Sequence, residues 1–83
     1  LTSYLKEKNF SEMRKWVVAN TDIDSARIFR KIYDGLYEYL KPEFIPQAVV
    51  ILARYQYQSA FVADQEILLV ACLTELMVNC EFV

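Results

Sequence analysis

The sequence predicts an all-α fold, a bundle of about five helices. Apolar residues recur at intervals of three and four along most of the chain, and no stretch alternates apolar and polar residues for long enough to form a strand. The most apolar segment runs from Ala63 to Val78, where every residue from Ile67 to Leu73 is apolar. We expect this segment to be the central helix, covered on all sides, with part of its cover supplied by another copy of the chain or by another subunit.

Length and composition predict one domain that spans residues 1–83. The chain has 83 residues, 55% of them hydrophobic, which is too apolar for a disordered segment. It opens with Leu1 instead of Met, so we expect it to be a fragment of a longer protein. A domain of this size hides only about 60 to 65% of the surface that its unfolded chain exposes. Some of the apolar surplus is therefore expected on the outside, which favours self-association.

Several classes of chemistry lack the residues that they need. The chain has no His, and its one Gly, Gly35, lies inside a predicted helix, so we expect no metal site and no phosphate-binding loop. Cys72 and Cys80 lie on one predicted helix, where a disulfide between them is geometrically excluded. The net charge of −2 gives no footprint for nucleic acid. We expect no catalytic, cofactor-binding or metal-binding residue in this chain, and a soluble cytoplasmic protein without a membrane span or a signal peptide.

The first half of the chain predicts three helices. A short amphipathic helix covers residues 1–8, and a second begins after Asn9, whose spacing to Glu12 resembles a capping box, and stops near Ala19. The apolar face of the second helix comprises Phe10, Met13, Trp16 and Val17. The third helix has three candidate N-caps, Thr21, Asp22 and Asp24, and ends before Pro42. Its apolar face comprises Ile28, Phe29, Ile32, Tyr33, Leu36 and Leu40.

Gly35 lies inside the third helix, although Gly costs about 1 kcal/mol relative to Ala in a helix interior. Either another helix approaches closely at this position, or the Gly is merely tolerated. The sequence favours neither alternative.

The second half predicts two more helices. The fourth extends from about Ile45 to Ser59, with Pro46 in its first turn, and a bend over residues 60–63 leads to Asp64 as the N-cap of the central helix. The inner side of the fourth helix comprises Ala48, Val49, Leu52, Tyr55 and Ser59, and its unusually apolar flank comprises Val50, Ile51 and Tyr57.

Apolar and aromatic residues in excess of what a small core needs indicate a protein interface. Aromatic rings beside Arg54 could also stack nucleic-acid bases, but the acidic balance of the chain favours a protein partner. The candidate oligomer interface comprises Tyr37, Val50, Ile51, Tyr55, Tyr57, Phe61 and Leu69. An alternative is a helical module that binds a peptide or an effector, with a groove formed by Val50, Ile51, Tyr57 and Phe61.

The order of four short segments resembles a known family. These segments are residues 5–10 (LKEKNF) followed by Arg14, residues 28–32 (IFRKI), residues 53–57 (ARYQY) and residues 63–69 (ADQEILL). Together they resemble the C-terminal collar domain of sliding-clamp loader ATPase subunits, of the replication factor C small-subunit type, in the version found in large tailed phages. Asp64 stands where the family usually has Asn, a change that preserves helix capping.

This resemblance implies a collar of about five helices that joins clamp-loader subunits into a ring. The partners would be copies of the chain and other clamp-loader subunits, with the sliding clamp and primed DNA reached through the full complex. ATP and Mg would be bound by upstream domains absent from this chain, so the fragment would not be an enzyme, whereas the full-length protein would be a clamp-loading AAA+ ATPase. For a phage-encoded protein the compartment would be the host cytoplasm.

Overall fold

The computed structural model describes residues 2–20 and 24–82, and it confirms the all-α fold. The described residues form five α-helices and one short 3-10 helix: α1 (Thr2–Lys6), α2 (Phe10–Ala19), α3 (Ser25–Tyr39), η1 (Pro42–Phe44), α4 (Ile45–Gln58) and α5 (Gln65–Asn79). The only β-type pairing in this part of the chain is an isolated bridge between Leu40 and Phe82. The helices follow the predicted order along the sequence.

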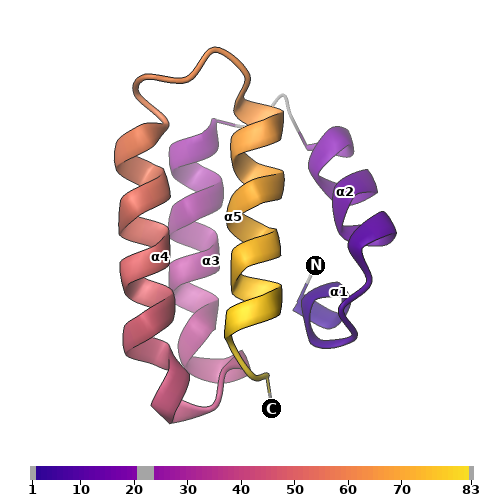
Figure 1. Cartoon of the computed structure of the whole chain (residues 1–83), viewed down its shortest axis with the longest axis vertical. Coiled ribbons are helices and arrows are strands. Elements are labelled where there is room, and N and C mark those ends of the chain that lie inside the picture. Colours follow the sequence, from indigo (N-terminus) through magenta and orange to yellow (C-terminus); the bar gives the residue numbers. More distant parts are fainter. Residues whose placement is uncertain (1, 21–23, 83) are drawn as a thin grey trace.

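Helix α5 is the central element of the bundle. It packs against α1 and α2 on one side and against α4 on the other, while α3 packs against α4 (Figure 1). A short connection closes the base of the bundle, because Lys41 N donates to Glu81 O at 3.1 Å and the two side chains form an ion pair at 3.0 Å. The C-terminal segment is thereby joined to the end of α3.

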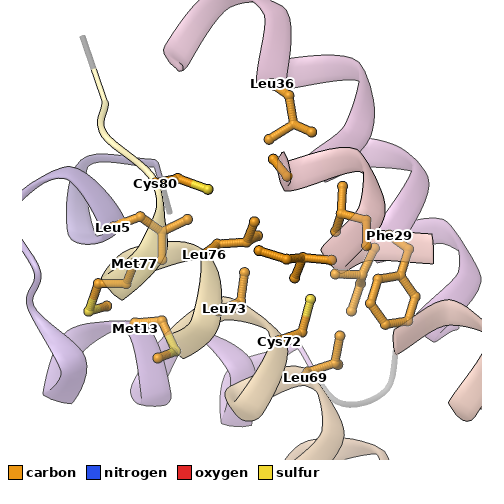
Figure 2. Close-up of a cluster of buried hydrophobic side chains, with 14 of the residues drawn as sticks. Leu5, Met13, Phe29, Leu36, Leu69, Cys72, Leu73, Leu76, Met77 and Cys80 are labelled. Atoms are coloured by element: carbon orange, nitrogen blue, oxygen red, sulfur yellow. The ribbon is translucent and has the colours of Figure 1, made fainter. Parts of the chain in front are cut away.

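The chain itself covers most of α5. Met77 faces Leu5 and Met13, whereas Leu69 and Cys72 point toward Phe29 of α3 (Figure 2). The buried side chains of α5 are Leu68, Leu69, Cys72, Leu73, Leu76 and Met77. Ile67 and Val78, each 66% exposed, share the one open face of the helix. Helices on both sides thus bury the core positions of α5, while Ile67 and Val78 leave one apolar face uncovered, so the expectation that another copy or another subunit supplies part of its cover stays a prediction.

Side-chain caps fix the starts of three helices, as the sequence predicts. Asn9 Oδ1 accepts from Glu12 N at 3.2 Å, and Asp24 Oδ1 accepts from Ala26 N at 3.1 Å. Asp64 Oδ1 accepts from Glu66 N at 3.0 Å and from Ile67 N at 3.3 Å. The two other cap candidates of the third helix, Thr21 and Asp22, lie outside the described residues.

Helix α1 ends two residues earlier than expected. Lys8 has a φ of 57°, in the left-handed region, and its N–H donates to Leu5 O at 3.2 Å while Asn9 N donates to Tyr4 O at 2.8 Å. This pair of bonds is the Schellman arrangement, which usually has Gly at the left-handed position. This turn changes the direction of the chain and leads into α2.

Gly35 is not a point of close helix approach. A Cβ atom built at this position would meet only the ring of Tyr39 in the same helix, with Tyr39 Cε2 at 3.2 Å. The Tyr39 ring therefore occupies the space beside the Gly, and no neighbouring helix among the described residues requires its small size.

The inner side of α4 is wider than predicted. Ala48 and Leu52 are buried as expected, but Ile51, which the sequence assigned to the outer flank, is only 2% exposed. Val49 and Tyr55 are half-buried. The physical reason is that α4 packs against both α3 and α5, so it buries a broad arc instead of a single stripe.

We expect Asp64→Ala to destabilise the domain by about 1 kcal/mol, because two N–H groups of α5 lose their side-chain acceptor. For a domain of this length, that loss lowers Tm by roughly 4 to 8 °C. Thermal unfolding followed by circular dichroism measures the effect. Asp64→Asn is the matched control and keeps most of the wild-type Tm, since Asn also caps helices. Equal losses in both variants would show that the carboxylate charge, and not the cap, stabilises α5.

Candidate interaction surface

The outer side of α4 and the turn after it are poor in charge and rich in exposed apolar groups. Arg54 is the only charged residue between Ile45 and Ala63. Val50, Tyr57 and Phe61 are 61%, 72% and 73% exposed, and we call these three residues the α4 surface. Charge depletion combined with aromatic residues and Arg is typical of the core of a protein interface.

The geometry of the α4 surface is fixed by the end of α4. The rings of Tyr57 and Phe61 lie 5.2 Å apart between centroids, at an interplanar angle of 53°. Gln65 Nε2 donates to Ser59 O at 2.9 Å, and Ser59 Oγ donates to Gln56 O at 2.6 Å, so the turn that carries Phe61 is tied to both helices. Val50 lies two helical turns before Tyr57 on the same face of α4. The three side chains therefore form a row along one edge of the bundle.

The one charge near this row is paired. Arg54 Nη1 lies 3.5 Å from Glu75 Oε1 of α5. Burial, followed by a hydrogen bond to the same carboxylate, raises the pKa of Tyr55 to about 12. Glu75 therefore pairs with Arg54, accepts a hydrogen bond from Tyr55 and links α4 to α5. Tyr55, which the sequence assigned to the interface, is a half-buried linking residue between the core and the surface.

Tyr37 lies on α3 and belongs to a second aromatic group. Its hydroxyl oxygen is 3.2 Å from that of Tyr33, the two rings are edge to face at 5.8 Å, and the Arg30 guanidinium lies 5.4 Å from the Tyr33 ring centroid. The hydrogen bond with Tyr33 raises the pKa of Tyr37. Tyr37 is exposed, as expected for a contact residue, but no interaction joins it to the α4 surface.

Two residues of the candidate interface lie in the core. Ile51 and Leu69 are each 2% exposed, so neither can touch a partner while the bundle is intact. Their helical positions are on the sides of α4 and α5 that face neighbouring helices of the same chain. Val62 and Ile67, which were not predicted as contact residues, are exposed at or next to the turn that carries Phe61. A periodicity analysis of α5 could have found Ile67, which is separated from Val78 by eleven residues, or three helical turns.

A groove lies elsewhere, between α2 and α3. It has a volume of about 430 Å³ and is lined by Leu5, Trp16, Ile28, Lys31, Ile32, Asp34, Gly35, Leu36, Glu38, Tyr39, Leu76 and Phe82. None of the residues expected to form a peptide-binding groove, which were Val50, Ile51, Tyr57 and Phe61, lines it. The structure thus separates an apolar edge on α4 from a concave surface on the other side of α3.

The thiols and the acidic groups of residues 2–20 and 24–82 form no site with evident chemistry. Burial raises the pKa of Cys72 to about 12 and also raises that of Cys80, which disfavours the reactive thiolate. Within the described residues, no three Cys, Asp or Glu side chains converge as metal ligands would. None of the helices of the described segments combines the length and the apolar character required to cross a bilayer.

Comparison with known proteins gives no assignment. No protein-family model matches the sequence, and no curated protein matches it.

Proposed function

We propose that this chain is an assembly domain of the clamp-loader collar type, which binds a neighbouring subunit through the α4 surface. The observation that carries the proposal is the row formed by Val50, Tyr57 and Phe61 on a charge-poor edge of the bundle. The collar-like segments in the sequence and the bundle of five helices support it.

Burial of the α4 surface would provide substantial binding energy. Covering a Val or Phe side chain completely contributes roughly 1.5 to 3 kcal/mol relative to leaving it exposed. The side chains of the α4 surface project from a helix and a tied turn, so little conformational entropy would be lost when a partner orders them. The α4 surface has one charge beside it, Arg54, and a partner that covered this charge would not leave it unpaired, since Arg54 has its partner in Glu75.

In a clamp loader, such a domain would hold the ATPase modules of neighbouring subunits together during ATP-dependent loading of a sliding clamp. ATP and Mg would be bound by other domains of the full-length protein, and the sliding clamp and primed DNA would be contacted by the whole complex. The residues of this chain would contribute assembly.

We expect the chain to self-associate, and we expect Val50→Glu to weaken that association at least ten-fold by placing a charge in an apolar contact. Sedimentation velocity over a range of concentrations measures the assembly, and circular dichroism checks that Tm is preserved. Val78→Glu is the matched control, because Val78 is 66% exposed on α5 and lies outside the α4 surface. Equal assembly of the wild type and the Val50→Glu variant, or a loss in the Val78→Glu variant alone, would contradict the proposal. A monomeric wild-type chain that binds an amphipathic peptide would support the alternative of a peptide-binding module.

A further inference from the structure

Helix α3 carries four exposed charged residues in a single stripe. Arg27, Lys31, Asp34 and Glu38 are all exposed, and their spacing of four, three and four places them on one face of the helix, within an arc of about 60°. We call these four residues the α3 charge stripe. The stripe extends roughly 16 Å along the helix, at a rise of about 1.5 Å per residue. It borders the groove beside Trp16, since Lys31, Asp34 and Glu38 line that groove.

The order of charge along this stripe is unfavourable for a helix on its own. Its basic residues lie in the N-terminal half and its acidic residues in the C-terminal half, opposite to the order that the helix dipole favours. Arg27 and Lys31 are like charges four residues apart, and so are Asp34 and Glu38, so that of the three neighbouring pairs along the stripe only Lys31 and Asp34 are opposite in charge. Asp34 has one partner outside the stripe, Arg30, whose Nε lies 3.2 Å from Asp34 Oδ1. The other three form no ion pair within the described part of the chain.

The same order of charge is complementary to that of a second α3 helix that runs in the opposite direction. The spacing of four, three and four reads identically in both directions, while the sign of the charge changes from one half to the other. When two α3 helices lie antiparallel, Arg27 of each copy therefore meets Glu38 of the other, and Lys31 of each meets Asp34 of the other. A two-fold axis between positions 32 and 33 generates all four pairs at once, as expected of an isologous contact.

We propose that α3 is a second contact surface whose occupant is the α3 helix of another copy, packed antiparallel across a two-fold axis. Exposed or half-buried apolar groups beside the stripe, Trp16, Ile32 and Tyr39, would fill the centre of the contact. The charge stripe would set the direction and register of the two helices, which is the usual role of charges beside an apolar helical contact. This inference does not rest on the proposed function, because the contact through α3 uses no residue of the α4 surface.

Charge reversal at positions 27 and 38 tests the pairing. Each of the single variants Arg27→Glu and Glu38→Arg replaces two attractive pairs by two repulsive ones, so we expect each to weaken the two-fold dimer by roughly ten-fold or more. The double variant, Arg27→Glu with Glu38→Arg in one chain, restores both pairs and the dimer. A mixture of the two single variants forms a heterodimer, because the two substituted side chains then attract each other in one pair while the native Arg27 and Glu38 attract each other in the other.

All of these variants are made in the Val50→Glu background, so that loss of contact through the α4 surface is separated from loss through α3. Sedimentation equilibrium at up to about 1 mM chain and low salt measures the dimer, and circular dichroism checks the fold. Arg14→Glu and Glu43→Arg are matched controls, since both residues are exposed and line neither the groove nor the charge stripe. The controls should leave the dimer unchanged. A monomeric Val50→Glu chain, single variants that dimerise as their background does, or a mixture that forms no heterodimer would each overturn the proposal.

Discussion

Leu69→Asp is expected to abolish folding of this chain. Leu69 is 2% exposed and lies among the core residues that join α5 to α3 and α4 (Figure 2). Losing a buried Leu side chain costs about 2 to 5 kcal/mol, and an unpaired carboxylate at the same place costs about 3 to 5 kcal/mol more. Small domains have unfolding free energies near the lower end of about 5 to 15 kcal/mol, so the two costs together exceed the free energy of unfolding of a domain of this size.

Far-ultraviolet circular dichroism and a urea titration measure this effect. Ile67→Asp is the matched control, because Ile67 lies two residues earlier on α5 and is exposed. Its carboxylate would lie in the first turn of the helix, where the dipole favours negative charge, so we expect Tm to change little. A Leu69→Asp variant with native helicity and the wild-type urea midpoint would show that the core of the bundle lies elsewhere.

The helices and their ends were predictable because they depend on local signals. Asn9 and Asp64 cap the helices that follow them, and Pro42 follows the end of α3, as the sequence indicates. The left-handed turn at Lys8 was missed, because Gly usually occupies such a position and Lys gives no signal for it. The surroundings of Gly35 were not predictable either, because the ring beside it belongs to Tyr39 of the same helix, and residue spacing alone does not specify that contact.

The candidate interface was only partly predictable, since exposure depends on how helices pack. Val50, Tyr57 and Phe61 are exposed as expected of contact residues, but Ile51 and Leu69 are buried by neighbours that the sequence could not position. The run of apolar residues in α5 predicted a central helix correctly. It did not predict that the other helices of so short a chain would cover most of α5.

The cover of α5 by its own chain changes which observations support self-association. Because most of α5 is covered, self-association is supported mainly by the charge-poor edge at Val50 and Tyr57 and by the self-complementary order of charge on α3. These two surfaces differ in chemistry. We therefore expect contact through α4 to persist at high salt, whereas contact through α3 weakens, because salt screens exposed ion pairs.

The domain is expected to lose stability as pH rises above 9. Burial raises the pKa of Cys72 from the 9.0 of an exposed thiol to about 12, and the side chain has no exposed surface. The unfolded chain therefore releases this proton at lower pH than the folded chain does. The stabilising effect of the neutral thiol is complete below pH 9 and is lost between pH 9 and about 12, at up to about 1.4 kcal/mol per pH unit.

Urea unfolding under reducing conditions at pH 8, 9, 10 and 11 measures this loss. Cys72→Ala should start with a lower free energy of unfolding, because a small cavity replaces the sulfur, but this free energy should fall less between pH 9 and 10. Tyr55→Phe separates the contribution of the half-buried Tyr55, whose pKa rises from 10.0 to about 12 because of burial and then its hydrogen bond to Glu75. This variant should keep the loss between pH 9 and 10 and reduce the loss above pH 10. Identical pH profiles for the wild type and Cys72→Ala would mean that the thiol is ionised as easily in the folded bundle as in the unfolded chain.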